Sequence, residues 1–476
     1  MTTEHDSDAV LHKLAEALGP RGFTRDAGDM APWLTDWRGR VTGQALALLS
    51  PDSTESVASI VRIAAAGGLA ITPQGGNSSM VAGATPPQDG RSLLLSLRRM
   101  NKIRDRSAED NSITAEAGVI LADLHDAAAL MDRRFPLSLA AKGSATVGGL
   151  VSTNAGGTQV LRFGNMRGLV LGLEAVLPDG EVFNGLASLR KDNRGYDLRQ
   201  LLIGAEGTLG IVTAATLRLV AAARQRVVAW VGLDSPQAAL RLLRRLDAAT
   251  GELVESFELI PANGLRLVMD RIPNARAPLG QAQPWNVLIE TTSSRDGDDL
   301  QHAVTEALAG ALEQGEIADA AIAGNEAQAA ALWHLRESLP EAERLDGIAV
   351  KHDIAVPVAA MPDFITRVSP EVERRFTGAR VLSFGHLGDG NIHFNIRAPI
   401  GSDAKAWVEA ETQAVNRFVH DAVLAAGGTI SAEHGIGQTK LHEYMRVADP
   451  VRLAAQQAIK RAFDPHGLMN PGKLVP

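Results

Sequence analysis

Two histidines on either side of a tight turn are the side chains in this sequence with the clearest chemical potential. His386 precedes and His393 follows the segment 387–392, which contains Gly-Asp-Gly-Asn, and apolar residues lead into and out of it. This pattern predicts a strand, a tight turn and a second strand. Asn395 lies two residues after His393, so both should point to the same face. Two neutral imidazoles held together in this way suit a divalent metal ion.

Such a pair still lacks an anionic ligand, and the best candidate is Glu433 in the loop 431–437. His434 follows directly, so two adjacent residues would supply a metal ligand and a general base. The alternatives stay open at this point. Two histidines across a turn are more often part of an ordinary polar loop, and His434 could instead be a ligand or a structural residue.

Composition limits the classes of protein to which the chain can belong. With 476 residues, 45% of them hydrophobic, two or three domains are expected. The formal charge of −8 without a basic run argues against a nucleic-acid or anionic-lipid partner, and 4% aromatic residues argue against stacking on single strands. The absence of cysteine excludes disulfides, thiolate-bound metals and cysteinyl-flavin links. No apolar run reaches the roughly 18–20 residues of a membrane span, and the polar N-terminus is unlike a signal peptide, so we expect a cytoplasmic protein.

Three glycine-rich blocks, at 73–79, 143–157 and 204–213, alternate with predicted strands and helices in the first 220 residues. Glycine lets backbone N–H groups turn inward and lets a phosphate approach closely. The first block alone could be an ordinary connection, and none matches a Walker A or a GxGxxG pattern. Together the three blocks predict one long ligand wrapped by backbone.

The elements that must position the histidines lie in the second half. Strands are expected within 226–260 and 285–292, with a helix at 236–250 between them. A helix over 325–339 should end or kink at Pro340, a short strand follows at 351–357, and the hairpin comes next. Further helices are expected at 406–426 and 451–463.

The glycine-rich blocks resemble the FAD-binding domain of the vanillyl-alcohol-oxidase superfamily, also called the PCMH-type fold. The hairpin histidines, Glu433-His434-Gly435 and the ending Asn-Pro-Gly-Lys at 470–473 resemble the FAD-linked 2-hydroxyacid dehydrogenases that act on D-lactate, glycolate or D-2-hydroxyglutarate. The resemblance implies an α+β protein. A PCMH-type FAD domain of two α/β subdomains would span 1–220, and an antiparallel-sheet substrate (cap) domain 221–425. A helical C-terminal segment, 426–476, would pack against the FAD domain.

The same resemblance implies which residues contact FAD. Covalent members commonly carry a histidine just after the first Gly-Gly, where this chain has Asn77, so the flavin is expected to be non-covalent. The implied contacts are Pro73, Gln74, Gly75, Gly76, Asn77, Ser78, Ser79, Ala84, Gly143, Ser144, Thr146, Gly149, Ser152, Thr153, Glu206, Gly207, Ile211 and Asn470.

It further implies a metal site formed by His386, His393 and Glu433, with His434 as catalytic base and substrate contact. Zn²⁺ is the expected ion, and Mn²⁺, Fe²⁺ and Co²⁺ suit the same donors.

The substrate would be bound by Arg336 and Lys351, two cations fifteen residues apart that match the carboxylate clamps of the 2-hydroxyglutarate members, and by Asn395. Either cation taken singly could simply be a solvated surface residue. Pro340 departs from the pattern, because it stands where members carry a substrate-contacting threonine.

The expected reaction is oxidation of D-2-hydroxyglutarate, with D-malate as a shorter diacid, by proton abstraction and hydride transfer to flavin N5. The alternatives are a D-lactate or glycolate dehydrogenase, a non-redox flavoprotein like the alkyl-glycerone-phosphate synthases, or a flavin-binding subunit without catalysis of its own. Because no NAD fingerprint is present, we expect an electron-transfer flavoprotein or a quinone as acceptor. The oligomeric state stays open, with a homodimer as one option.

Overall fold

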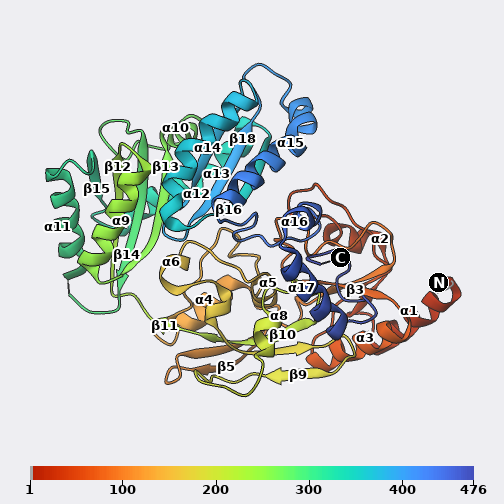
Figure 1. The fold of residues 1–476 in the computed structure, drawn as a ribbon. Helices are drawn as coiled ribbons and strands as arrows, with labels where there is room; N and C mark the ends of the chain where they lie inside the picture. Colours follow the sequence, from red (N-terminus) through yellow and green to blue (C-terminus); the bar gives the residue numbers. More distant parts are fainter. Residues whose placement is uncertain (1–3, 298, 476) are drawn as a thin grey trace. The chain divides into compact units, whose positions relative to one another are not determined.

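The computed structural model describes residues 4–297 and 299–475. The chain forms two compact units. The first unit comprises Met1–Gly157, Gly164–Ala222 and Glu433–Pro476, and the second comprises Thr158–Phe163 and Ala223–Ala432. Figure 1 labels their elements along the chain. None of the described helices is both long and apolar enough to cross a bilayer.

The first unit contains a small parallel sheet with helices packed on it. Its strands run in the order β1 (Phe23–Thr24), β2 (Leu48–Leu49), β4 (Ser92–Ser96), β3 (Ala70–Gln74), and only β1 is antiparallel to its neighbour. The helices α1 (Glu4–Leu18) and α3 (Thr54–Ala66) share one apolar core with these strands. The Ser53 hydroxyl caps α3 by accepting from the Ser56 amide.

A second, antiparallel sheet completes the first unit. Its order is β5 (Ile103–Ser107), β6 (Ser112–Glu116), β10 (Ile211–Arg218), β8 (Val170–Val176), β9 (Val182–Gly185), and a short ladder joins β7 (Arg133–Arg134) to β11 (Val220–Ala221). The helices of this unit include α4 (Leu121–Ala129), α5 (Val147–Thr153), α8 (Leu198–Leu202), α16 (Leu441–Val447) and α17 (Pro450–Phe463).

The helix α5 lies in the second glycine-rich block, whose composition predicts a poor independent helix. It forms because Val147, Leu150 and Val151 are buried and Asn154 closes its end with a left-handed φ of 50°. Tertiary burial therefore outweighs the weak local propensity of this block.

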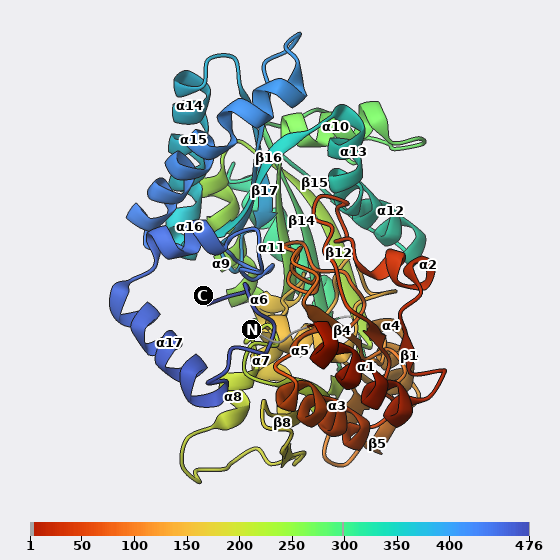
Figure 2. The same cartoon turned by 90° about the vertical axis from the view of Figure 1, so that its right-hand side faces the viewer.

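The second unit is built on one seven-stranded antiparallel sheet. Its order is β15 (Asp319–Ile322), β12 (Gln225–Leu233), β14 (Trp285–Ser293), β13 (Val254–Pro261), β17 (Arg380–His386), β18 (Asn391–Arg397), β16 (Ala349–Ala355). One face carries α9 (Pro236–Thr250), α11 (Asp299–Glu313), α14 (Met361–Arg375) and α15 (Ala404–Ala425), and the other carries α10 (Ala262–Arg271), α12 (Glu326–Glu337) and α13 (Leu339–Asp346). Figure 2 shows α14 and α15 on one side of the strands and α10, α12 and α13 on the other.

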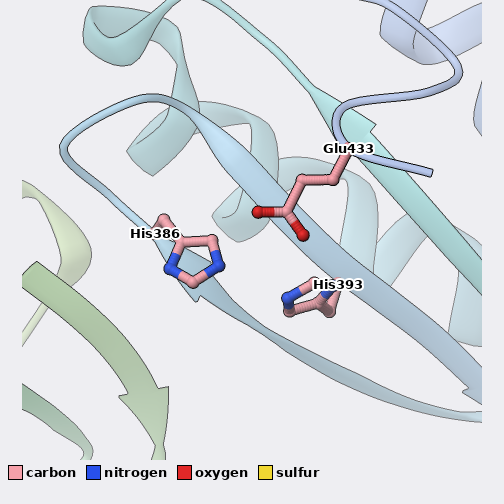
Figure 3. A group of neighbouring side chains, drawn as sticks. All are labelled: His386, His393 and Glu433. Atoms are coloured by element: carbon pink, nitrogen blue, oxygen red, sulfur yellow. The ribbon is translucent and has the colours of Figure 1, made fainter. Parts of the chain in front are cut away.

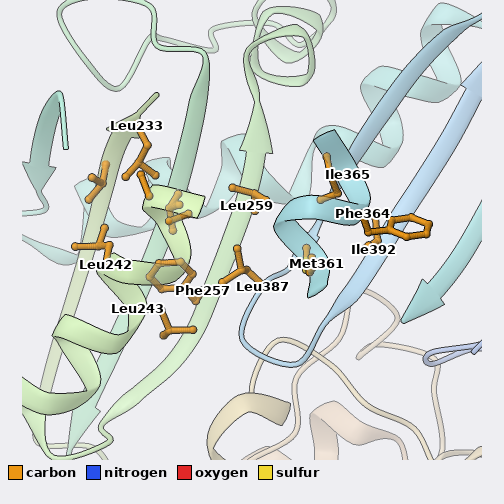
Figure 4. Close-up of a cluster of buried hydrophobic side chains, with 14 of the residues drawn as sticks. Leu233, Leu242, Leu243, Phe257, Leu259, Met361, Phe364, Ile365, Leu387 and Ile392 are labelled. Atoms are coloured by element: carbon orange, nitrogen blue, oxygen red, sulfur yellow. The ribbon is translucent and has the colours of Figure 1, made fainter. Parts of the chain in front are cut away.

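Successive side chains along a strand point to opposite faces of the sheet, and this determines which of them point away from the core below α9 and α14. Phe257, Leu259 and Ile392 are buried under α9 and α14 (Figure 4). Burying each such side chain stabilises the fold by roughly 1.5–3 kcal/mol. Their neighbours Glu258 and His393 must point to the opposite face, since a shift of one residue would bury the polar set instead.

Pro340 was expected to end or kink the helix before it. The structure ends α12 at Glu337, and Pro340 lies in the first turn of the next helix, α13. The ring is tolerated there because the first N–H groups of a helix need no partner within it.

Candidate functional site

The predicted hairpin is formed by β17 and β18, and it carries both histidines on one face. His393 pairs in register with Phe384, and His386 pairs with Asn391. The two imidazole centroids are 5.6 Å apart with the rings nearly perpendicular. Gly390 makes the turn with a φ of 81°, and a Cβ there would meet the Val356 carbonyl oxygen at 2.0 Å. The glycine is therefore required both by its backbone angle and by the close approach.

Glu433 joins these histidines because the chain just before it is held on β16. Thr429 forms a bridge with Ala355, and the Ala432 amide donates to the Asp353 carbonyl at 3.3 Å. Ligand atoms of His386, His393 and Glu433 all lie within 4.8 Å of one another. Figure 3 shows the carboxylate facing the two rings. Two imidazoles and one carboxylate are a donor set that fits Zn²⁺ and leaves a position for a substrate oxygen.

His434 belongs to a second, overlapping group. Its ligand atoms, with those of Asp353 and Glu433, lie within 4.8 Å of one another. Neighbouring carboxylates stabilise an imidazolium, which is the form that a general base reaches when it accepts a proton. Sequence reasoning missed Asp353, although it lies two residues after Lys351 in an expected strand and so shares its face.

Arg336, in the last turn of α12, is held by a buried carboxylate that was not predicted. Glu258 is fully buried on β13, and its Oε2 accepts from Arg336 Nε at 2.7 Å. Its Oε1 lies 2.5 Å from Nδ1 of His386. Burial by itself would raise the pKa of Glu258, but Arg336 and His386 lower it to about 2. An acidic residue inside the apolar strand 254–261 was the signal that could have revealed it.

Lys351 and Asn395, the other predicted substrate contacts, share a second buried carboxylate. Glu343 on α13 accepts from Lys351 Nζ at 3.2 Å and from Asn395 Nδ2 at 3.0 and 2.9 Å. Strand register places Lys351 directly opposite Asn395. The helix α13, whose first turn contains Pro340, therefore supplies the partner of the predicted lysine clamp.

The glycine-rich blocks meet in the first unit. A Cβ on Gly76 would lie 1.8 Å from the Ser144 carbonyl oxygen, and one on Gly75 would lie 2.2 Å from Thr146 Oγ1. Within the described residues, Thr146 Oγ1 and Gln74 Oε1 are buried without a hydrogen-bond partner. Buried polar atoms of this kind usually mark a missing ligand or water, so the loops fit a polar cofactor such as FAD.

Four predicted cofactor side chains tie segments of the protein together. Gln74 donates to the Trp33 and Ala84 carbonyls, Asn77 to that of Thr35, and Asn470 to those of Gly83 and Glu206. The Glu206 carboxylate accepts from the Ile436 and Gly437 amides at 2.8 and 2.7 Å. Burial raises the pKa of Glu206, while the two amide donors lower it.

Backbone strain gathers in the same loops. Asn77, Glu206 and Asn470 all adopt left-handed φ angles of 53°, 53° and 44°. Such angles cost free energy in residues other than glycine and tend to occur at ligand sites.

The remaining predicted contacts lie in or beside the glycine-rich loops, and the side chain of Ile211 is the exception. Pro73, Ser78, Ala84, Gly149, Ser152 and Gly207 lie in or beside the same loops, with Pro73 and Gly207 in close approach. The hydroxyl of Ser79 accepts from the Gly83 amide, that of Thr153 donates to the Gly149 carbonyl, and a Cβ on Gly143 would meet nothing within 4 Å. Ile211 differs, because its side chain packs in the apolar core and leaves only its backbone for a ligand.

Comparison with known families agrees with this geometry. Residues 45–185 match the FAD binding domain, and residues 222–474 match the C-terminal domain of FAD linked oxidases. The second match covers more than half of the chain, so the protein belongs to the FAD-linked oxidases.

Two D-2-hydroxyglutarate dehydrogenases are similar to this chain over nearly its whole length. The mitochondrial D-2-hydroxyglutarate dehydrogenase of Rattus norvegicus is 35% identical over 97% of this chain and 84% of its own length. The D-2-hydroxyglutarate dehydrogenase of Xanthomonas citri pv. viticola is 35% identical over 98% of this chain and 97% of its own. The crystal structure of p-cresol methylhydroxylase superposes with a TM-score of 0.75 at 15% identity, covering 99% of this chain and 97% of that one, which confirms the PCMH-type fold.

Proposed function

We propose that this protein oxidises D-2-hydroxyglutarate to the 2-oxoacid with FAD and a divalent metal ion, and accepts D-malate as a shorter diacid. The observation that best supports this proposal is the polar face of the seven-stranded sheet. There the ligand atoms of His386, His393 and Glu433 lie within 4.8 Å of one another. Two cations, Arg336 and Lys351, belong to the same unit as the two histidines. The relatives named D-2-hydroxyglutarate dehydrogenase support the choice of substrate.

The residues divide the work as follows. Arg336 and Lys351 bind the two carboxylates of the diacid and thereby orient its C2 centre. His434 accepts the hydroxyl proton, and the carboxylates beside it stabilise the resulting imidazolium. A cation held by His386, His393 and Glu433 would lower the pKa of the substrate hydroxyl. FAD, when bound, supplies the hydride acceptor.

The cofactor and partners complete the proposal. Asn77 stands where a covalent link would need histidine, so FAD is bound non-covalently. The metal is Zn²⁺, with Mn²⁺, Fe²⁺ and Co²⁺ as alternatives for the same donors. Electrons pass to an electron-transfer flavoprotein or a quinone. The cytoplasmic location and the homodimer expected from the sequence stay predictions.

A D-lactate or glycolate dehydrogenase is the second candidate. The observation that favours it is Lys351, whose ammonium is already engaged by Glu343 at 3.2 Å. A lysine neutralised in this way attracts a second substrate carboxylate less strongly. Pro340 also favours the second candidate, because it has no hydroxyl group with which to bind a diacid.

The test is anaerobic stopped-flow reduction of the bound flavin by D- and L-2-hydroxyacids, before and after EDTA. Fast bleaching by D-2-hydroxyglutarate that EDTA abolishes is the expected result. Bleaching by D-lactate and by no diacid would transfer the assignment to the second candidate. Bleaching that EDTA does not affect would refute the metal site, and no bleaching by any acid would indicate a non-redox flavoprotein.

A further inference from the structure

Glu258 connects two parts of the proposed site that the sequence places far apart. Its carboxylate is buried on β13, and strand register places it directly opposite His386 on β17. One oxygen lies 2.5 Å from His386 Nδ1, and the other accepts from Arg336 Nε at 2.7 Å. A single rigid carboxylate thus touches a candidate metal ligand and a candidate substrate clamp.

Each contact engages one nitrogen of a side chain that has at least one further nitrogen. An anionic acceptor at Nδ1 holds the ring proton there, which leaves Nε2 of His386 as the lone-pair donor. On Arg336 the carboxylate takes Nε, and within the described residues neither terminal amino group makes a hydrogen bond. Those two groups form the fork that binds a carboxylate in bidentate geometry.

Aromatic contacts also hold Arg336 and His393 in place. The Arg336 guanidinium lies over the Phe384 ring, 5.0 Å from its centroid. Phe384 in turn packs against His393, with ring centroids 5.0 Å apart. The Arg336 guanidinium thus contacts both Phe384 and Glu258, and these contacts link Glu258 to His393 as well as to His386.

We propose that Glu258 is a positioning residue that sets the tautomer of His386 for metal binding and the orientation of Arg336 for substrate binding. The inference deepens the proposed function and rests on its metal site. It predicts that metal affinity depends on a carboxylate that contributes no ligand atom.

Glu343 provides a matched control in the same unit. It is also a buried carboxylate, 1% exposed, and it also holds a predicted substrate cation, Lys351. Its carboxylate accepts from Lys351 and Asn395, and its backbone carbonyl accepts from Arg397. None of these three is a candidate metal ligand. Replacing either glutamate by glutamine removes one buried negative charge with little change in shape.

The experiment measures Zn²⁺ and Co²⁺ affinity of the FAD-loaded wild type, Glu258→Gln and Glu343→Gln by competition with a chromophoric chelator. We expect Glu258→Gln to weaken binding by about 10- to 100-fold, the usual cost of losing such a partner. Glu343→Gln should stay within about threefold of the wild type, because this carboxylate contacts no candidate metal ligand. A wild type that binds no metal would refute the proposed metal function itself. A wild type that binds metal and a folded Glu258→Gln that binds equally well would overturn only the inference.

A measurement on the wild type keeps the test valid if Glu258→Gln does not fold. Nitrogen-15 spectra of histidine-labelled, metal-free protein, assigned with His386→Gln, report which ring nitrogen carries the proton. Protonation of Nδ1 in His386 is expected. A proton on Nε2 with a bare Nδ1 would show that Glu258 does not set the tautomer.

Discussion

Replacing Lys351 by methionine tests whether the substrate carries a second carboxylate. The substitution removes the ammonium and keeps a side chain of similar length. Lys351 is three-quarters buried and its Nζ lies 3.2 Å from Glu343, which is almost fully buried. After the change Glu343 keeps two hydrogen bonds from Asn395 but loses its cation. Substrate binding should therefore lose an attraction and meet an uncompensated negative charge.

The size of the effect follows from these contacts. A hydrogen bond to a charged group contributes about 1.5–3 kcal/mol, which corresponds to a fall of roughly 10- to 150-fold in kcat/KM for D-2-hydroxyglutarate. D-lactate has no distal carboxylate, so its kcat/KM should change by less than about threefold, the scale of a lost peripheral contact. Lys351→Met should lower the free energy of unfolding by less than the value of about 3–5 kcal/mol for a fully broken buried ion pair, because the hydrogen bonds from Asn395 to Glu343 remain.

The assay is steady-state oxidation of both acids with an artificial electron acceptor, together with FAD content and Tm of each variant. Lys405→Met, the same substitution at an exposed site on α15, is the control and should match the wild type. An equal fall for both acids would show that Lys351 acts through the structure of the site. An unchanged kcat/KM for the diacid at full FAD content would refute the clamp.

Three further predictions concern the cofactor, the metal and pH. Gly76→Ala should lose FAD, because its Cβ would lie 1.8 Å from the Ser144 carbonyl oxygen, whereas a Cβ on Gly143 meets no protein atom within 4 Å. Gly143→Ala is the control and should keep its FAD. If the two variants have equal Tm but Gly76→Ala shows less flavin absorbance, the ligand binds at the Gly76 loop. Full FAD in Gly76→Ala would contradict the loop geometry. Chelation should abolish flavin reduction by substrate but leave FAD bound, since the candidate ligands lie outside the glycine-rich loops; flavin release with the metal would contradict this. Burial lowers the pKa of Lys473 to about 8 from 10.5, so the unfolded chain binds that proton more tightly. Stability should therefore rise between about pH 8 and 10, by up to about 3 kcal/mol from this residue. Chemical unfolding of Lys473→Met should show a shallower rise, and an identical rise would refute the shift.

Local sequence signals predicted those elements that have capping or turn residues at their ends. The expected helix over 236–250 is confirmed to the residue as α9, because Ser235 caps its start and Gly251 ends it with a φ of 67°. The hairpin is confirmed for a similar reason, since its turn residues and flanking apolar alternation lie within one short stretch. The PCMH-type fold was implied by the family resemblance of the three glycine-rich blocks, and it is confirmed.

Features that depend on distant partners were missed. Glu258 lies 78 residues from Arg336 and 128 from His386, and Glu343, although only 8 residues from Lys351, lies 52 residues from Asn395. The cofactor contact of Glu206 stays a prediction, but the acceptance by its carboxylate of two amides 230 and 231 residues away was not foreseen. Residues 158–163 belong to the second unit although they interrupt the first, and no composition change marks them.

The sequence by itself determined the chemical inventory of this protein: two histidines in a hairpin, an adjacent Glu433-His434 pair, three glycine-rich blocks and no cysteine. These are properties of residue type and short spacing, which local backbone geometry converts directly into turns and strands. Only the tertiary structure decided how each charge is compensated. A buried carboxylate is tolerated only with hydrogen-bonded partners, and those partners arrive from other strands and helices once the sheet has formed. The pairing of Glu258 with His386 and Arg336 is therefore a consequence of strand register and helix packing, which no local stretch of sequence encodes.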